Sequence, residues 1–175
     1  MKTIYLSLGS NLGDRANNLV RAVETLAERG VRIVRQSSIY ETEPVDVRAQ
    51  SWFLNCVVEA RTVWMPRQLL RTLLEIEKSL GRRRRVPGGP RVIDIDILLF
   101  GSSTVRTREL EIPHPRMTKR RFVLVPLAEI APGVQHPLLK KTISELLAGT
   151  PDRSEVRLFH GRNNDRASIE GRSPC

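Results

Sequence analysis

The chain has 175 residues, 40% of them hydrophobic, and a formal net charge of +10 at pH 7. This length and composition favour one compact α/β or α+β domain with a sizeable core. The two cysteines, Cys56 and Cys175, form no disulfide framework and no CxxC metal pattern, which fits a reducing cytoplasm. No apolar run is long enough for a signal peptide or a membrane-spanning helix. We therefore expect a cytoplasmic protein that has no membrane partner.

The positive charge is confined to two short segments. Residues 82–91, "RRRRVPGGPR", hold five arginines, and residues 116–121, "RMTKRR", hold four basic residues, with no acid in either. Outside them, 20 Lys and Arg balance 19 Asp and Glu. A nucleic-acid binder usually spreads its charge along a groove or helix. Two local clusters instead fit a small polyanion with metal, such as a nucleoside triphosphate, and no nucleic-acid partner.

The first half of the chain alternates strand and helix. Residues 3–8 read as a strand, and Asp14 can cap a helix that runs to about residue 29. Residues 31–40 alternate as a second strand. The loop of about a dozen residues after it, "ETEPVDVRAQS", is long enough to indicate a binding role.

The next elements complete a recognisable order. We expect a strand at 53–60, a helix at 65–80 and a strand at 93–100. Pro66 in the first turn and Gly81 at the end mark the limits of this helix. The order β-α-β-β-α-β predicts an α+β, ferredoxin-like core, with an antiparallel sheet and two helices on one face. In this interpretation the central strands are 3–8 and 93–100.

The rest of the chain is less informative. Residues 105–150 should add a short strand and a helix near 142–148. We expect one domain over 1–160 and a disordered polar tail over 161–175. "IEGR" at 169–172 also matches a protease site used in expression vectors, so part of the tail need not be native.

The stretch "GPRVIDIDILLF" places two acids in an apolar strand. Side chains alternate along a strand, so Asp94 and Asp96 share one face, about 6–7 Å apart. The same face should continue with the apolar residues Leu98 and Phe100, so it is not simply a solvent-exposed face. Water is the ordinary partner of such a pair. Mg²⁺ is the alternative, because it binds hard oxygen ligands and substrate phosphates.

Several other residues are ambiguous when they are taken alone. "GSNLG" at 9–13 could bind phosphate, but a plain tight turn is favoured because the known phosphate-loop spacings are missing. Phe53 and Asn55 share a strand face and could hold a flat heterocycle, although a core Phe is the more ordinary reading. Phe122 could be a second stacking ring or a core residue. His114 lies between two prolines and could reach phosphate or ribose; a zinc role is not indicated.

The arginine run also has two interpretations. Arg82–Arg85 would ordinarily be solvated surface. Beside Gly88-Gly89 and Arg91, the run instead reads as a cationic flap, since glycines act as hinges and arginine binds phosphate in a bidentate manner.

Together these stretches resemble the hydroxymethyldihydropterin pyrophosphokinases of folate biosynthesis over roughly residues 2–150. The resemblance rests on "LSLGSNLGD", "SSIYETEP", "FLNCVV", "IEKSLGR", "GPRVIDIDILLF", "IPHPRM" and "RRFVLVPLAEIAP". It implies transfer of pyrophosphate from ATP to the hydroxymethyl group of 6-hydroxymethyl-7,8-dihydropterin, with release of AMP. It also implies two Mg²⁺ ions. We expect a monomer whose partners are these two small molecules.

The resemblance assigns roles by position. The implied metal ligands are Asp94 and Asp96, and the implied catalytic loop arginines are Arg82 and Arg91. The implied pterin contacts are Thr42, Val45, Phe53, Asn55 and Phe122. The implied ATP contacts are Glu77, Arg84, Ile97, His114 and Arg120.

The sequence departs from the family pattern in a few places. The arginine loop, residues 82–91, is one residue shorter than in the family pattern, and Gly88 stands where a bulky aromatic residue can occur. Glu109 and Glu111 replace residues that can assist ATP, and Asp46-Val47 replaces a glycine-containing turn. These departures concern loop motion and ATP affinity, not the reaction.

Two other functions remain possible at this stage. A basic ferredoxin-like domain can bind RNA, but such domains carry aromatic residues on a central strand, where this chain carries aspartates. Another two-metal nucleotide transferase would release pyrophosphate. AMP formation that depends on the pterin separates these alternatives.

Overall fold

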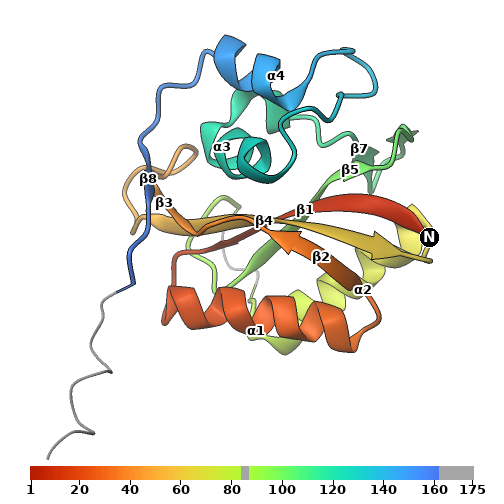
Figure 1. Ribbon diagram of the computed structural model, residues 1–175. Helices are drawn as coiled ribbons and strands as arrows, with labels where there is room; N and C mark the ends of the chain where they lie inside the picture. The colour runs from red at the N-terminus through yellow and green to blue at the C-terminus, as the bar shows by residue number, and fades with distance from the viewer. Residues whose placement is uncertain (84–86, 162–175) are drawn as a thin grey trace, which may run out of the picture.

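An antiparallel sheet forms the middle layer of the computed structural model, which describes residues 1–83 and 87–161 (Figure 1). The strand order is β5-β1-β4-β3-β8, and β2 pairs with β4 off this path. The strands are β1 (Lys2–Ser10), β2 (Arg32–Gln36), β3 (Tyr40–Thr42), β4 (Phe53–Thr62), β5 (Asp94–Phe100) and β8 (Val156–Leu158). A separate small hairpin pairs β6 (Val105–Arg106) with β7 (Glu111–Ile112).

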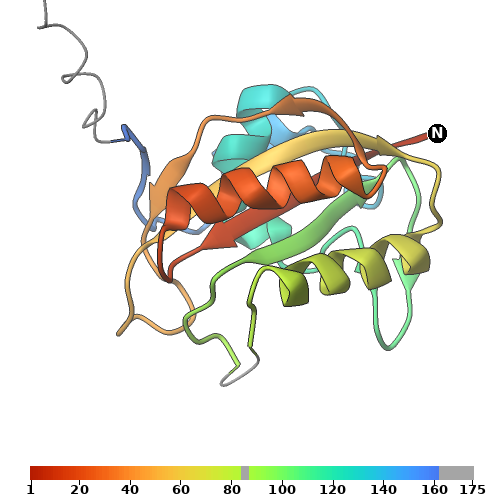
Figure 2. The same ribbon diagram turned by 90° about the horizontal axis from the view of Figure 1, so that it is seen from below.

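Helices cover both faces of the sheet. They are α1 (Arg15–Glu28), α2 (Pro66–Ser79), α3 (Arg121–Ile130) and α4 (Ile143–Gly149), with a short 3₁₀ turn η1 (Met117–Lys119) before α3. Helices α1 and α2 lie side by side on one face, and α3 and α4 lie on the other (Figures 1 and 2). Each face has its own apolar core: Leu19 and Leu73 belong to the first, Leu124 and Leu127 to the second. Burial of these side chains is the main stabilising contribution.

The expected β-α-β-β-α-β core is confirmed, and so are its helix boundaries. The Asp14 carboxylate caps α1 by accepting from the backbone N–H of Asn17 at 3.1 Å. Pro66 begins α2, and Gly81, with φ +98°, follows its end in the left-handed conformation that glycine favours.

The expectation that β5 is central is wrong. Within the described residues β5 pairs only with β1, whereas β1 pairs with β4 and β5, and β4 pairs with β1, β2 and β3. The central strands are therefore β1 and β4. The reason is the split arrangement, in which β4 inserts beside β1 and leaves β5 at the outside.

The face expected for Phe100 is also wrong. The register between β1 and β5 shifts between Tyr5 and Leu6, which pair with Leu99 and Ile97. The extra residue is Leu98. Such a bulge interrupts the two-residue alternation. Leu98 and Leu99 consequently both join the α3-side core, whereas Phe100 joins the α1–α2 side.

The strand expected over 31–40 is broken into β2 and β3. At the break, Ser37 replaces regular pairing: its backbone N–H donates to the Val57 carbonyl, and its hydroxyl accepts from the Val57 N–H at 2.9 Å. The backbone of Val57 is thus satisfied without a continuous strand.

Helix α3 and strand β8 were not expected, whereas α4 confirms the helix near 142–148. Helix α3 is apolar nearly throughout and contains Pro126, so it has neither a clear helical stripe nor an ordinary helical composition. The expected tail lies almost wholly outside the described residues. In the described part of the chain, no helix combines the length and apolar character needed to cross a membrane.

Candidate active site

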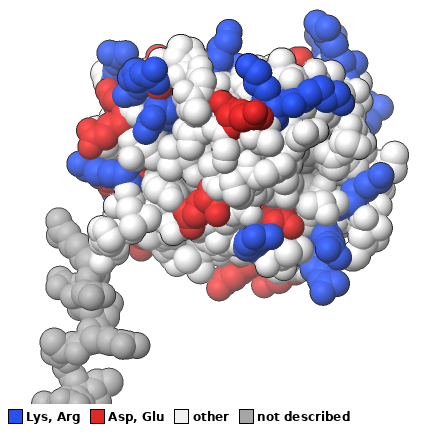
Figure 3. Space-filling view, turned by 45° about the horizontal axis from the view of Figure 1, so that its top comes forward, with Lys and Arg blue, Asp and Glu red and all other residues white. Residues whose placement is uncertain are grey.

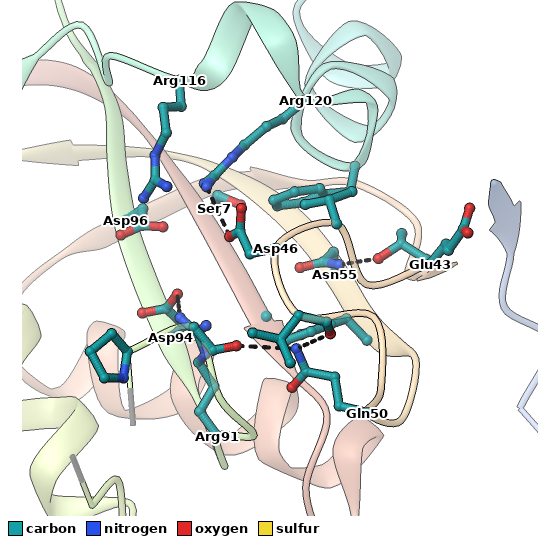
Figure 4. Close-up of a pocket in the computed structure, with 18 of the residues that line it drawn as sticks. Ser7, Glu43, Asp46, Gln50, Asn55, Arg91, Asp94, Asp96, Arg116 and Arg120 are labelled. Carbon is teal, nitrogen blue, oxygen red and sulfur yellow. Dashed lines mark hydrogen bonds and ion pairs between the residues drawn. The ribbon is translucent and has the colours of Figure 1, made fainter. Parts of the chain in front are cut away.

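A cavity of about 530 Å³ opens on the sheet face opposite α1 and α2. It is floored by β1, β4 and β5, and closed at the sides by the loop before β4 and by the segment that enters α3 (Figure 4). On the same sheet face, Tyr5, Val57 and Leu98 pack beneath α3. The cavity therefore occupies the part of this face that α3 leaves uncovered.

Two arginines converge on Asp94. Nη1 of Arg82 lies 2.7 Å from its Oδ1, and Nη1 of Arg91 lies 2.8 Å from its Oδ2. All three side chains are about one-fifth exposed. Such partly buried, charge-assisted pairs are stronger than surface ion pairs. Asp94 therefore binds two guanidinium groups of the arginine loop at the floor of the cavity.

Glu77 lies beneath this cluster and is not part of the cavity wall. It is 3% exposed, its Oε1 accepts from the Ile95 backbone N–H at 2.7 Å, and its Oε2 pairs with Arg82. Burial raises the pKa of Glu77 to about 7, while these two partners oppose that shift. Glu77 thus holds β5 and Arg82 in position from below.

Asp96 lines the cavity two residues further along β5. Burial raises its pKa to about 6, and the nearby charge of Asp94 adds to the shift. Arg120, Arg82 and Arg91 act in the opposite direction. Figure 4 shows Arg116 and Arg120 extending from the segment above towards the floor of the cavity. A cation bound beside Asp96 would act in the same direction as Arg82, Arg91 and Arg120.

The other end of the cavity combines aromatic and amide groups. Asn55 is buried, and its Nδ2 donates to the Thr42 hydroxyl at 2.6 Å. Phe53 lies two residues before Asn55 on β4, and the Arg91 guanidinium sits 5.7 Å from the centre of its ring. Phe122, at the start of α3, also lines the cavity. These groups could stack on a flat heterocycle and bind its polar edge.

Gly9 on β1 makes room for Asn55. A Cβ built on Gly9 would stand 2.5 Å from Oδ1 of Asn55. A larger residue would therefore displace the amide from the cavity floor. The "GSNLG" segment thus begins with a glycine that the close approach requires.

Asn11, the third residue of the "GSNLG" segment, has a structural role in the turn. Its Oδ1 accepts from the Arg91 backbone N–H at 2.8 Å, and its own N–H donates to the Arg91 carbonyl at 3.1 Å. Its Nδ2 donates to Gln50 Oε1 and to the Ser51 carbonyl, at 2.9 and 3.1 Å. Gln50 in turn donates to the Gly88 carbonyl at 3.1 Å. Asn11 therefore joins the loop before β4 to the arginine loop.

His114 and Arg120 come from the segment between β7 and α3. Burial lowers the pKa of His114 to about 4, and the charges of Arg120 and Arg116 act in the same direction. Its Nδ1 accepts from the Arg116 backbone N–H at 3.1 Å, which leaves the proton of the neutral ring on Nε2. Arg120 pairs with Asp46 at 3.3 Å (Figure 4). This part of the wall offers N–H donors to an anion.

The structure brings most of the sequence-predicted site residues to this one cavity. They are Thr42, Val45, Phe53, Asn55, Arg82, Arg91, Asp94, Asp96, His114, Arg120 and Phe122. Glu77 and Ile97 are not among its lining residues, because Glu77 lies beneath Arg82 and Ile97 points into the α1–α2 core. Arg84 lies outside the described residues.

The sequence reasoning missed several lining residues, including Ser7, Glu43, Gln50 and Arg116. Some signals were present. Gln50 lies in the loop suspected of binding, Arg116 begins the second basic segment, and Ser7 is one strand period from Gly9. Their contribution could be recognised only once β1, β4 and β5 were placed side by side.

The residues present fit Mg²⁺ at the aspartate pair. Among residues 1–83 and 87–161, no group of three or more His, Cys, Asp or Glu side chains could hold a metal ion. Mg²⁺ does not need such a group, because it is usually held by one or two carboxylates together with water and substrate phosphates. Asp94 and Asp96 supply two such carboxylates on one face of the cavity.

A ferredoxin-like α+β fold with paired aspartates, converging arginines and aromatic rings in one cavity defines a phosphotransferase class of enzyme. Residues 5–132 match the sequence model of the family described as 7,8-dihydro-6-hydroxymethylpterin-pyrophosphokinase (HPPK). The chain belongs to this family and is accordingly a pyrophosphokinase.

Named relatives agree with this membership. The chain is 48% identical over 156 residues to the 2-amino-4-hydroxy-6-hydroxymethyldihydropteridine pyrophosphokinase of Bacillus subtilis, covering 89% of each chain. It is 43% identical over 145 residues to the protein of the same name from Aquifex aeolicus, covering 83% of this chain and 90% of the relative.

Solved structures support the fold. The wild-type HPPK-DHPS of Plasmodium falciparum matches with a TM-score of 0.68 at 19% identity. The match covers 84% of this chain and 44% of that chain, so this chain spans less than half of the solved protein. This similarity bears on the architecture alone.

Proposed function

We propose that the protein transfers pyrophosphate from ATP to the hydroxymethyl group of 6-hydroxymethyl-7,8-dihydropterin, releasing AMP, as a step of folate biosynthesis. The observation that carries the proposal is the meeting of two chemistries in one cavity. Asp94 with its two arginines lies at one end, and Phe53 with Asn55 lies at the other. The names of the relatives point to the same pterin and to transfer of pyrophosphate.

In this proposal the pterin occupies the aromatic end. Phe53 and Phe122 stack on the ring, and the Asn55 amide bonds to its polar edge, with Thr42 fixing the amide orientation through the 2.6 Å bond. Val45 adds an apolar contact from the loop before β4.

The triphosphate occupies the charged end. Asp94 and Asp96 would hold two Mg²⁺ ions, which when bound neutralise phosphate charge and lower the pKa of the attacking hydroxyl. The neutral His114 donates from Nε2, and Arg120 adds a guanidinium. Ile97, as a residue of β5, and Glu77, which binds the β5 backbone at Ile95, would support the ATP site without lining this cavity.

Arg82 and Arg91 act as the catalytic arginines. Both now pair with one carboxylate, Asp94. Because their guanidinium groups also match phosphate oxygens, they can transfer from the carboxylate to the phosphates when the substrate arrives. Their strongest interaction would then coincide with the charge that develops during transfer.

The chemistry needs no nucleophile from the protein. The hydroxymethyl oxygen of the pterin forms a bond to the β-phosphorus, the bond between the α–β bridging oxygen and the β-phosphorus breaks, and AMP leaves. The attacking oxygen loses its hydroxyl proton to water. The protein contributes positioning and charge neutralisation, which dominate phosphoryl transfer.

Product analysis tests this proposal. The protein is incubated with ATP, Mg²⁺ and 6-hydroxymethyl-7,8-dihydropterin, and the nucleotides are separated by chromatography. AMP that forms only when the pterin is present supports the proposal. Release of free pyrophosphate would indicate another nucleotide transferase, and absence of turnover with both substrates would favour a binding module.

The oligomeric state, the location in the cell and nucleic-acid binding are separate questions from the reaction. A monomer, a cytoplasmic location and the lack of a nucleic-acid partner stay predictions from the sequence. Figure 3 shows Lys and Arg dispersed over the face that is turned towards the viewer, with uncharged and acidic surface between them. On this face the basic side chains are separated by acidic and uncharged surface, which fits the balance of charge outside the two basic segments.

A further inference from the structure

The last strand of the described chain braces the pterin end of the cavity. β8 lies beyond residue 132, where the match to the family ends, and pairs with β3 in the register Glu41↔Arg157 and Thr42↔Val156. β3 in turn pairs with β4 through Thr42↔Phe53. β8 is therefore one strand removed from the ring that the proposed function places against the pterin (Figure 1).

Hydrogen bonds extend this pairing into the cavity wall. The Glu43 N–H donates to the Glu155 carbonyl at 3.1 Å, and the Glu155 N–H donates to Glu43 Oε2 at 3.2 Å. Glu43 lines the cavity beside Thr42. The backbone at the start of the loop before β4 is thus fixed from outside by the C-terminal segment.

Arg157 holds the other end of the same loop. Its guanidinium lies 4.6 Å from the centre of the Trp52 ring, and its Nη2 lies 2.6 Å from Glu41 Oε1. Arg15 of α1 binds the same carboxylate at 2.9 Å and donates to the Trp52 carbonyl at 2.8 Å. The Trp52 ring and carbonyl are therefore both held, and Trp52 directly precedes Phe53.

We infer that Arg157 is a positioning residue for the pterin end of the cavity, acting through Glu41 and Trp52. The inference rests on the proposed function. Glu41 directly precedes Thr42, and Trp52 directly precedes Phe53, so Arg157 fixes the backbone on both sides of the proposed pterin contacts. Small displacements of such groups change affinity and rate far more than they change stability.

If Arg157 had a purely structural role, its loss would lower the melting temperature, whereas a positioning role predicts an effect on pterin binding. Arg157 is 57% exposed, and exposed ion pairs contribute little to folding. Loss of Arg157 should therefore hardly change the melting temperature. It should weaken pterin binding while ATP binding at the far end, near Asp94 and Asp96, stays the same.

The test compares Arg157→Ala with a matched control. Arg35→Ala removes an arginine that is 58% exposed and pairs with Glu59 at 3.2 Å on β2 and β4, and Arg35 and Glu59 are both absent from the cavity lining. Arg157→Lys keeps the charge near Glu41 but loses the planar stacking on Trp52. Calorimetry measures the Kd of 6-hydroxymethylpterin with Mg²⁺ and a non-hydrolysable ATP analogue, and steady-state kinetics give the KM of both substrates.

We expect Arg157→Ala to raise the pterin Kd and KM by about five-fold, with the ATP KM within about two-fold of wild type. Arg157→Lys should lie between, and Arg35→Ala should match wild type. Equal pterin Kd values for wild type and Arg157→Ala would overturn the inference and leave the proposed function standing. So would a parallel rise of the ATP KM. Failure of the wild-type protein to bind the pterin would overturn both.

Discussion

Nη1 of Arg91 lies 2.8 Å from Oδ2 of Asp94, so a loop arginine and a strand aspartate form one ion pair inside the cavity. The pair links the segment rich in arginine to the strand that carries the proposed metal ligands. It also places the same guanidinium over the ring of Phe53. Both ends of the cavity thus depend on this contact.

The aspartate pair should be essential for turnover. Asp94→Asn and Asp96→Asn each remove a metal-binding charge with little change of size, so each should lower kcat by about 10²-fold or more. Circular dichroism should show that both variants remain folded. Glu75→Gln, at an exposed ion pair with Arg29, is the control. Full turnover by either aspartate variant at ordinary Mg²⁺ would remove the metal assignment.

The two arginines bound to Asp94 should matter more than their neighbour. Arg82→Ala and Arg91→Ala should each reduce kcat by about ten-fold or more, a loss of about 1.4 kcal/mol of transition-state stabilisation. Arg83→Ala, at an exposed position in the same run, should change kcat little. Single-turnover kinetics separate these effects from binding. If Arg83→Ala were as damaging as Arg91→Ala, the run would act as a general positive patch.

Asn11 should support both loops at once. Asn11→Ala leaves the Arg91 N–H and Gln50 without their partner, and the loss should destabilise the protein by about 1–3 kcal/mol. It should also lower kcat, because the Arg91 backbone loses its anchor. Asn18→Ala is matched to it, since the Asn18 side chain donates to the Ser10 hydroxyl and the Leu12 carbonyl and, in the described part of the chain, to neither loop. Urea denaturation and kinetics that give equal results for the two variants would contradict this role.

Gly9 should be needed for the Asn55 amide. Gly9→Ala places a Cβ 2.5 Å from Asn55 Oδ1, so the amide must move, and the pterin KM should rise by about ten-fold. Gly149→Ala, which meets nothing within 4 Å, is the control. The comparison is made from initial rates at saturating ATP. An unchanged pterin KM in Gly9→Ala would mean that Asn55 does not bind the substrate.

His114 should give a defined pH dependence of stability. Its pKa is about 4 in the folded protein and about 6.5 when unfolded, so between these values only the unfolded chain takes up the proton. Stability should therefore rise with pH across this window, by on the order of 1–2 kcal/mol from this group between pH 5 and pH 7.

Urea denaturation at several pH values measures this contribution. His114→Gln should flatten the wild-type slope by that amount, and His160→Gln, at an exposed position, is the control. Identical slopes for wild type and His114→Gln would show that the imidazole is not held neutral.

Local patterns in the sequence predicted the parts of the fold that depend on neighbouring residues. The Asp14 cap, Pro66 and Gly81 marked the ends of α1 and α2, and the two-residue period placed Asp94 and Asp96 on one face. Each of these features depends only on residues a few positions away.

Features that depend on partners distant in sequence were not predictable in this way. The bulge at Leu98 is visible only against β1, and β8 forms only because β3 offers a free edge. The ATP role that the family resemblance implies for Glu77 stays a prediction, but the sequence did not show that its carboxylate binds the Ile95 N–H and Arg82 beneath the cavity. The sequence indicated an ordinary turn residue at Asn11, whereas the structure shows that its side chain bonds to two loops that are distant in sequence.

The most direct test of the account follows the phosphorus atoms themselves. ATP labelled with different isotopes at the β and γ positions is supplied with Mg²⁺ and 6-hydroxymethyl-7,8-dihydropterin, and the products are separated and counted. The account predicts that both labels reach the pterin product in equal amounts and that the nucleotide product is unlabelled AMP. Transfer of the γ label alone with formation of ADP, or recovery of both labels as free pyrophosphate, would contradict it.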